Sequence, residues 1–139
     1  MPKIFIIILN YNGYSDTAGL LPTIFKLKNR GYSLQIILVD NGSSEQELNL
    51  LKNLLKKKYK NIKLILNHKN LGFAKGNNIG INYALKHGAD YILLLNNDTK
   101  IEMNFLPSLL RLDAGISSPV VKFREFKDKT IIASVHRLH

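Results

Sequence analysis

The sequence contains no cysteine among its 139 residues. Disulfide bonds and thiolate metal sites are therefore excluded, and we expect a reducing, cytoplasmic setting. Long apolar runs are missing as well. The run over residues 4–9 is too short for a membrane span or a signal-peptide core, and it ends at Asn10 without a small-residue cleavage site. We interpret this run as a buried strand.

Glycine-rich phosphate-binding motifs are also absent. No GxGxxG follows the first apolar run, and no GxxxxGK followed by Ser or Thr occurs anywhere in the chain. Dinucleotide binding and P-loop chemistry therefore lose their usual sequence support. An unrelated receiver-like or flavodoxin-like α/β domain is an alternative, but a receiver needs an acidic cluster at the end of the first strand. This chain has Asn10 and Asn12 there.

Acidic residues are scarce, with 10 Asp and Glu against 20 Lys and Arg, which gives a formal charge of +10. Much of the positive charge lies in Lys52 and Lys56-Lys57-Lys58-Tyr59-Lys60, at the end of an expected helix, where cations are favoured by the helix dipole. We interpret this cluster first as a solvated helix end. Peripheral contact with anionic lipid headgroups at the inner membrane face is the alternative. No aromatic-interleaved basic stripe supports a nucleic-acid partner.

The remaining composition, 45% hydrophobic and 22% charged, is that of one globular domain. Buried strands are expected over residues 3–9, 34–39, 62–66 and 91–95. Helices are expected over residues 15–30, after the capping box Ser44-Glu45-Gln46-Glu47, and over residues 72–87. Pro22 implies that the first helix is kinked or begins near that residue. The alternation predicts βαβ crossovers and an α/β fold with a mostly parallel sheet.

Two further patterns concern the helices and the end of the chain. In the second helix Leu48, Leu51, Leu54 and Leu55 share one face, and in the third Phe73, Gly80, Ile81, Ala84 and Leu85 recur at helical spacing. Residues 105–112 have a helical pattern, residues 115–123 look extended, and residues 130–135 predict one more strand.

Polar segments follow the four expected strands. They are Leu9-Asn10-Tyr11-Asn12-Gly13, Val39-Asp40-Asn41-Gly42-Ser43-Ser44, Asn70-Leu71-Gly72-Phe73-Ala74-Lys75-Gly76-Asn77-Asn78-Ile79-Gly80 and Leu95-Asn96-Asn97-Asp98-Thr99. The carboxyl edge of an open α/β sheet is where ligands bind. The acids Asp40 and Asp98 at two such ends suggest a phosphorylated ligand held with a divalent cation.

In this order and spacing, the four segments resemble the nucleotide-sugar-binding half of family 2 glycosyltransferases of the GT-A fold, in particular rhamnosyltransferase-like members. The resemblance covers residues 3–121. It implies a Rossmann-like, three-layer α/β/α fold with strand order three, two, one, four. Residues 1–139 would then form a single donor-binding domain from which most of the acceptor-binding half is absent. Asp40 and Asp98 would lie two strand spacings apart, about 9 to 10 Å.

The resemblance also implies roles for individual residues. Asn10, Tyr11 and Asp40 map to the residues that hold base and ribose, although Asp40 could instead stabilise its turn and Tyr11 could simply pack. The stretch from Gly72 would bring backbone amides to the ligand, or Gly76 and Gly80 could serve close helix-to-sheet packing.

Within this helix, Asn78 matches an asparagine common in the family. Asn77 stands where many members carry Arg. Lys75 is therefore the candidate cation for the diphosphate, with a solvated surface lysine as the alternative.

Asn96-Asn97-Asp98 corresponds to the DXD motif of the family, whose first residue contacts the nucleotide sugar and whose last binds Mg²⁺ or Mn²⁺. The resemblance implies that all three residues, Asn97 included, contact the nucleotide sugar. Asn at the first position leaves the metal to Asp98, so we expect weak metal binding without nucleotide. Alternatively, Asp98 is an N-cap or turn residue.

The expected function is metal-assisted, inverting transfer of a sugar from a UDP- or dTDP-linked donor to a growing polysaccharide or a lipid-linked glycan. No catalytic base can be assigned, because neither Asp113 nor Asp128 matches a family motif. A non-catalytic nucleotide-sugar-binding fragment, or an inactive remnant of the fold, is the alternative.

Overall fold

The computed structural model describes residues 1–27, 31–111, 116–117, 120–122, 130–132 and 135–137. Its strands are β1 (Lys3–Asn10), β2 (Ser33–Asp40), β3 (Lys63–Leu66), β4 (Tyr91–Asn96), β5 (Ile116–Ser117), β6 (Val120–Lys122), β7 (Thr130–Ile132) and β8 (Val135–Arg137). Its helices are α1 (Tyr14–Phe25), α2 (Glu45–Lys58), α3 (Phe73–Lys86) and α4 (Phe105–Leu110). Side chains are described up to residue 111, apart from residues 28–30.

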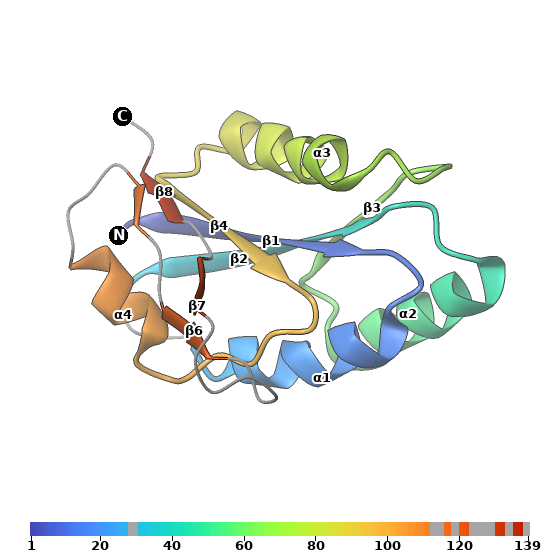
Figure 1. Cartoon of the computed structure of the whole chain (residues 1–139), viewed down its shortest axis with the longest axis horizontal. Coiled ribbons are helices and arrows are strands. Elements are labelled where there is room, and N and C mark those ends of the chain that lie inside the picture. The colour runs from blue at the N-terminus through green and yellow to red at the C-terminus, as the bar shows by residue number, and fades with distance from the viewer. Residues whose placement is uncertain (28–30, 112–115, 118–119, 123–129, 133–134, 138–139) are drawn as a thin grey trace.

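A six-stranded sheet with the order β3-β2-β1-β4-β8-β5 forms the middle layer (Figure 1). Its first four strands are parallel, which confirms the predicted order three, two, one, four. β8 pairs antiparallel with β4 and with β5, while β6 and β7 form a separate two-stranded sheet. The sheet is therefore mostly parallel, and its antiparallel strands lie beyond β4.

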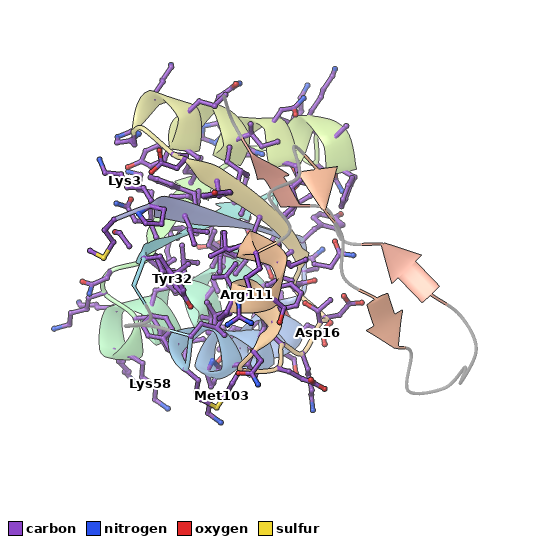
Figure 2. The ribbon with its side chains drawn as sticks, turned by 90° about the vertical axis from the view of Figure 1, so that its left-hand side faces the viewer. Lys3, Asp16, Tyr32, Lys58, Met103 and Arg111 are labelled. Atoms are coloured by element: carbon purple, nitrogen blue, oxygen red, sulfur yellow. The ribbon has the colours of Figure 1, made fainter. Side chains whose placement is uncertain are left out.

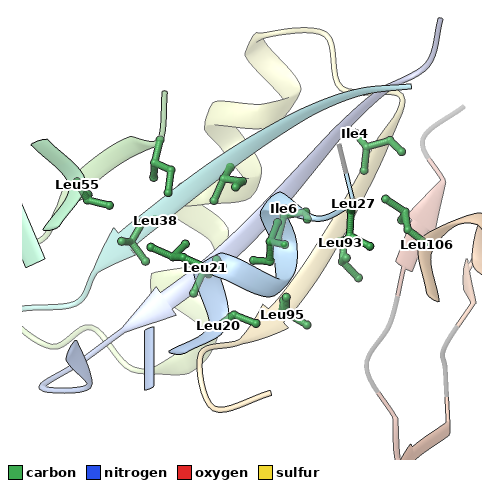
Figure 3. Packing of buried hydrophobic residues seen from close by; sticks show 14 of the residues in the cluster. Ile4, Ile6, Leu20, Leu21, Leu27, Leu38, Leu55, Leu93, Leu95 and Leu106 are labelled. Atoms are coloured by element: carbon green, nitrogen blue, oxygen red, sulfur yellow. The ribbon is translucent and has the colours of Figure 1, made fainter. Parts of the chain in front are cut away.

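Helices cover both faces of the sheet, with α1, α2 and α4 on one side and α3 on the other (Figure 1). Successive side chains of β1 alternate between the two layers: Ile4, Ile6 and Ile8 pack in the larger cluster, whereas Phe5 and Ile7 pack against α3. Figure 3 shows the larger cluster, in which residues of α1, α2 and α4 meet the sheet. Burial on both faces explains why this strand reads as a continuous apolar run.

The first helix differs from its expected range. It begins at Tyr14 and ends at Phe25, so a start near Pro22 is wrong, and Lys26 and Leu27 lie beyond its end. Residues 28–30 of the expected range lie outside the described residues. Pro22 lies inside the helix and is exposed. Because proline has no backbone N–H, one hydrogen bond of the helix is missing. Pro22 is close to the end of α1, so few helical residues follow it.

The second helix confirms one half of its capping box. The Ser44 hydroxyl accepts from the Glu47 amide at 3.3 Å. The Glu47 carboxylate does not return to Ser44 but accepts from the Tyr14 amide at 2.9 Å, at the first residue of α1. Glu47 therefore takes part in the start of both helices, through its backbone amide in α2 and through its carboxylate in α1. Leu51 and Leu55 are buried on the predicted face.

The apolar face expected for α3 is wrong in part. Phe73 and Leu85 are 63% and 46% exposed, whereas the buried residues are Gly76, Asn77, Gly80 and Ala84. A Cβ on Gly80 would stand 2.5 Å from Cγ2 of Ile7. The helix lies so close to the sheet that small residues occupy the contact, while Phe73 and Leu85 are exposed.

The last part of the chain follows the expected pattern with shorter elements. The helix expected over 105–112 is α4, with Leu112 outside the described residues. Within the extended stretch 115–123 the structure describes β5 and β6, and within the strand expected over 130–135 it describes β7 and the first residue of β8. The other residues of both stretches lie outside the described residues.

Candidate functional site

The carboxyl ends of β3, β2, β1 and β4 meet at one edge of the sheet. Asn10 pairs with Asp40 on one side of β1, and Leu9 pairs with Asn96 on the other. The turn after β4 is closed by the Thr99 amide and hydroxyl, which donate to the Asn96 carbonyl at 3.3 and 2.6 Å. Asp40 and the turn that carries Asp98 therefore flank the end of β1.

Asn10 is a buried hub, 1% exposed, at the end of β1. Its Nδ2 donates to Oδ2 of Asp40 at 2.9 Å and to the Ser43 hydroxyl at 3.3 Å. Its Oδ1 accepts from the Thr17 hydroxyl at 2.8 Å and from Nδ2 of Asn97 at 3.5 Å. Both donors and both lone pairs of this amide are thus used within the protein. Its predicted contact with the ligand stays a prediction.

Asp40 is also almost fully buried, at 1% exposure. Its Oδ1 accepts from the Ser43 amide at 3.0 Å, and its Oδ2 accepts from the Ser43 hydroxyl at 2.6 Å as well as from Asn10. The turn-stabilising alternative is therefore part of what this residue does. Because a carboxylate has about four lone-pair sites, one acceptor position on Oδ1 is left for a ligand.

A second buried asparagine, Asn41, joins the next pair of strand ends, and the sequence reasoning did not identify it. Its Nδ2 donates to Oδ1 of Asn70 at 3.0 Å and to the Gly72 carbonyl at 3.2 Å. Its Oδ1 accepts from Nδ2 of Asn67 and from the Leu71 amide, both at 3.1 Å. The β3–α3 loop is therefore held against the end of β2. The asparagines of that loop are the sequence signal that could have indicated this role.

The start of α3 faces the same edge without a side-chain cap. Gly72 is its N-cap, with φ of 82°, and no atom of the described residues beyond its chain neighbours lies within 4 Å of where a Cβ would stand. Backbone N–H groups at such a helix start are a favourable place for an anion. Lys75 and Asn78 lie in the first turns of this helix and are exposed, whereas Asn77 is buried and donates to the Phe73 carbonyl at 3.0 Å.

The three residues of the DXD-like segment are placed differently. Asn96 and Asp98 are exposed, and no hydrogen bond to either side chain occurs within the described part of the chain. Asn97 is half-buried, and its Nδ2 donates to the Gly13 carbonyl at 3.3 Å and the Thr17 hydroxyl at 3.2 Å. The N-cap of α4 is Asn104, so Asp98 is a turn residue and not an N-cap.

A divalent cation fits this edge only together with a ligand. Among the described residues, no group of three His, Cys, Asp or Glu could hold a metal ion. The exposed Asp98 carboxylate provides one hard oxygen ligand. Mg²⁺ is commonly bound by one or two carboxylates together with substrate phosphates, so the donor set suits a metal–diphosphate complex better than a bare ion.

A family profile described as "Glycosyl transferase family 2" matches residues 5–128. The chain is 30% identical over 107 residues to the dTDP-rhamnosyl transferase RfbF of Shigella flexneri. The match covers 77% of this chain and 33% of that protein. The chain is 33% identical over 99 residues to an uncharacterized glycosyltransferase of Haemophilus influenzae, covering 70% and 37%. It thus spans about a third of these relatives.

Two solved structures share the fold at low sequence identity. One is S. aureus TarS 1-349 in complex with UDP-GlcNAc, with a TM-score of 0.70 and 16% identity, covering 97% of this chain and 45% of that one. The other is the mannosyltransferase PcManGT from Pyrobaculum calidifontis in complex with GDP-Man and Mn²⁺, with a TM-score of 0.68 and 19% identity, covering 88% and 36%.

Proposed function

Since this chain belongs to glycosyl transferase family 2 and has the GT-A type of fold, we propose that its carboxyl sheet edge binds the nucleotide diphosphate of a sugar donor. The observation that carries the proposal is the placement of Asp40 and the Asp98 turn on opposite sides of the end of β1. The relatives include a dTDP-rhamnosyl transferase, and a UDP-GlcNAc complex exists for one structural neighbour. Both support UDP or dTDP as the nucleotide.

The chemistry of the residues at this edge suits distinct parts of a nucleotide sugar. The remaining acceptor position of Asp40 suits a base N–H or a ribose hydroxyl, and Tyr11, 51% exposed, can cover the base. Asn96 can bond the ribose or the sugar, while Lys75, Asn78 and the amides after Gly72 face the charged diphosphate. Asp98 would hold Mg²⁺ or Mn²⁺, and the ion when bound would offset charge on the leaving diphosphate.

The complete reaction would be inverting transfer to a glycan or lipid-linked acceptor. Inversion requires a general base opposite the leaving group, which takes the acceptor proton. No residue of the described chain is assigned that role. A non-catalytic module that holds a nucleotide sugar without turnover would share the donor site described here, and only a transfer or donor-hydrolysis assay separates the two.

Titration with UDP and dTDP, each with and without Mn²⁺, tests the proposal. We expect binding of at least one nucleotide by calorimetry, strengthened about tenfold or more by Mn²⁺ because Asp98 and the diphosphate would both be ligands of the same ion. AMP, which lacks the diphosphate, is the control and should gain nothing from the metal. A chain that binds no nucleoside diphosphate under any of these conditions overturns the proposal.

The opposite edge of the sheet is strongly basic. Because α1, α2 and α3 run back across the sheet, their carboxyl ends meet there, beside the starts of β1 and β3. Exposed lysines at these positions are Lys3, Lys26, Lys58, Lys63 and Lys86. Figure 2 shows Lys3 and Lys58 extending on the same side of the molecule. Residues 48–89 contain no Asp or Glu.

A shallow hollow of about 270 Å³ between α2 and β3 adds Lys52, Lys56 and Lys60 around an apolar floor that includes Leu55 and Ile62. In the described part of the chain, no helix is long and apolar enough to span a bilayer. Contact of this basic edge with an anionic lipid surface, and with it a place at the inner membrane face, stays a prediction.

Vesicle flotation measures that contact. If the edge binds anionic lipid, the Lys57→Gln/Lys58→Gln double variant should lose up to about fivefold in partitioning per lysine, and the loss should shrink as salt rises. Lys69→Gln/Lys100→Gln is the matched control, because it makes the same change of charge away from the end of α2. Equal binding to neutral and anionic vesicles would leave the lysines as a solvated helix end.

A further inference from the structure

A continuous hydrogen-bond network joins the two halves of the proposed donor site. It runs from the Asp98 turn through the Asn97 side chain to Thr17 and Asn10, and from Asn10 to Asp40. From there the Ser43 hydroxyl continues it to the backbone of the β1–α1 loop, where it accepts from the Asn12 amide at 2.8 Å. The loops after β1, β2 and β4 are therefore connected by side chains of three elements.

The directions of the bonds that Asn10 makes follow from the Asp40 carboxylate. An ionised carboxylate can only accept, so Asp40 holds Nδ2 of Asn10 toward itself and turns Oδ1 of Asn10 toward Thr17 and Asn97. All three partners of Asn97 then offer lone pairs: Oδ1 of Asn10, the Gly13 carbonyl and the Thr17 hydroxyl. Asn97 must consequently present its N–H groups inward, and a carboxylate could not replace it.

Thr17 is the buried centre of the connection. It is 0% exposed, so it cannot contact a nucleotide sugar. Its hydroxyl donates a hydrogen bond to Asn10 and accepts one from Asn97. The contact is also sterically tight, because a Cβ on Gly13 would stand 2.5 Å from Nδ2 of Asn97. The turn after β4 is thus fitted closely to the corner between β1 and α1.

We infer that Asn97 and Thr17 are positioning residues, which fix the Asp98 turn to the nucleoside side of the site and make metal and nucleoside binding interdependent. The inference rests on the proposed donor site, and it replaces the direct donor contact predicted for Asn97. A ligand that orders Asp40 orders Asn10, and through Thr17 and Asn97 it orders the turn that carries Asp98. By linkage, the metal must strengthen nucleoside binding by the same factor.

The Asn97→Asp variant separates the two roles by the sign of its effect. If Asn97 faced the metal, an added carboxylate beside Asp98 would tighten Mn²⁺ binding in the presence of UDP. If it is a positioning residue, an acceptor-only group would face three acceptors, and Mn²⁺ binding should weaken by about threefold to tenfold, the range expected for the loss of one hydrogen bond. Calorimetric titration of Mn²⁺ at saturating UDP gives the sign, and tighter binding overturns the inference.

Thr17 variants test the coupling itself. Thr17→Val removes the hydroxyl at nearly constant volume and should lower the mutual enhancement of UDP and Mn²⁺ by about fivefold, a typical size for coupling between sites. Thr17→Ser keeps the hydroxyl and should restore it. Thr23→Val is the matched control, since it removes a hydroxyl of the same helix that donates to the Leu20 carbonyl, outside the network. Thermal unfolding shows whether each variant is folded.

Amide hydrogen exchange on the free chain tests the connection through Thr17 separately from nucleotide binding. The Ser43 amide donates to Asp40 and the Thr99 amide to Asn96, on opposite sides of β1. Thr17→Val should speed exchange at both amides by about threefold or more, whereas Thr17→Ser and Thr23→Val should not. Unchanged exchange at Ser43 in Thr17→Val refutes the connection, while absence of UDP and dTDP binding in the unmodified chain refutes the donor site alone.

Discussion

Replacing Asp98 by alanine is expected to abolish the enhancement of nucleotide binding by Mn²⁺. The carboxylate is exposed at the turn after β4, and the described part of the chain offers no cluster of acids to take its place. Changes to groups that merely support a metal ligand lower metal affinity by about 10- to 100-fold, so loss of the ligand itself should lower the affinity for Mn²⁺ by about 100-fold or more and leave nucleotide binding the same with and without Mn²⁺. Calorimetric titration of UDP or dTDP at fixed Mn²⁺ measures the change.

A control variant shows whether the effect comes from Asp98 itself or from the loss of any negative charge nearby. Glu102→Ala removes the same charge from an exposed residue four positions further along, and it should leave the Mn²⁺ effect within about twofold because exposed charges are screened. Asp98→Asn should be intermediate, since it keeps an oxygen but loses the charge. Full Mn²⁺ dependence in Asp98→Ala would remove Asp98 from the metal site and leave the cation without an assigned ligand.

Titration of Mn²⁺ without nucleotide tests how the protein binds the metal ion alone. One carboxylate leaves most of the coordination shell of Mg²⁺ or Mn²⁺ to water and phosphate oxygens. Mn²⁺ titrated without nucleotide should therefore bind weakly, and the affinity should rise once UDP or dTDP is present. The first position of the segment is Asn96, which keeps hydrogen-bonding capacity but adds no charge, so the nucleotide must contribute the missing negative oxygens.

The central sheet could be predicted from the sequence because its signals are local. A strand buried on both faces needs a continuous apolar run, and β1, β2 and β4 each show one, from Ile4, Ile36 and Ile92 onward. The strand order comes from the resemblance, since the runs themselves do not say which strands pair. The antiparallel pairing of β8 with β4 joins residues far apart in the sequence, so no local pattern could show it.

The error in the buried face of α3 has a simple physical origin. Helical spacing identifies a face but not how close the neighbouring layer lies, so the pattern alone places Phe73 and Leu85 on the buried face. The sheet approaches that helix closely enough for Gly80 to meet Ile7, and Phe73 and Leu85 are left exposed. Side-chain size at the contact is a better guide to this face than apolarity.

The site was predictable as a set of segments but not as a set of bonds. Asp40 and the Asp98 turn lie where the strand order requires, because the ends of parallel strands share an edge. The sequence could not show that Asn10 and Asn97 use their amide groups inside the protein, or that Thr17 connects them. The residue type alone does not show whether an asparagine side chain bonds a ligand or neighbouring residues of the protein.

Gly42 is expected to be the glycine whose replacement by alanine costs most. Its φ is 86°, and an added Cβ would stand 2.5 Å from the carbonyl carbon of Lys69 and 2.8 Å from the Asn70 nitrogen. These neighbours are backbone atoms of the β3–α3 loop, so they cannot give way as a side chain could. The left-handed conformation costs about 1 to 2 kcal/mol for alanine, and the overlap should add about 1 to 3 kcal/mol.

Comparison of Gly42→Ala with Gly31→Ala isolates the cost of the steric overlap. Gly31 has nearly the same φ, 82°, but no atom of the described residues beyond its chain neighbours lies within 4 Å of its added Cβ, so only the conformational cost applies. Urea unfolding should therefore show a loss for Gly42→Ala about 1 to 3 kcal/mol larger than for Gly31→Ala. Equal losses would mean that the β3–α3 loop moves freely. The extra loss should come with weaker UDP binding, because displacing Asn70 breaks its bond to Asn41 and shifts the start of α3.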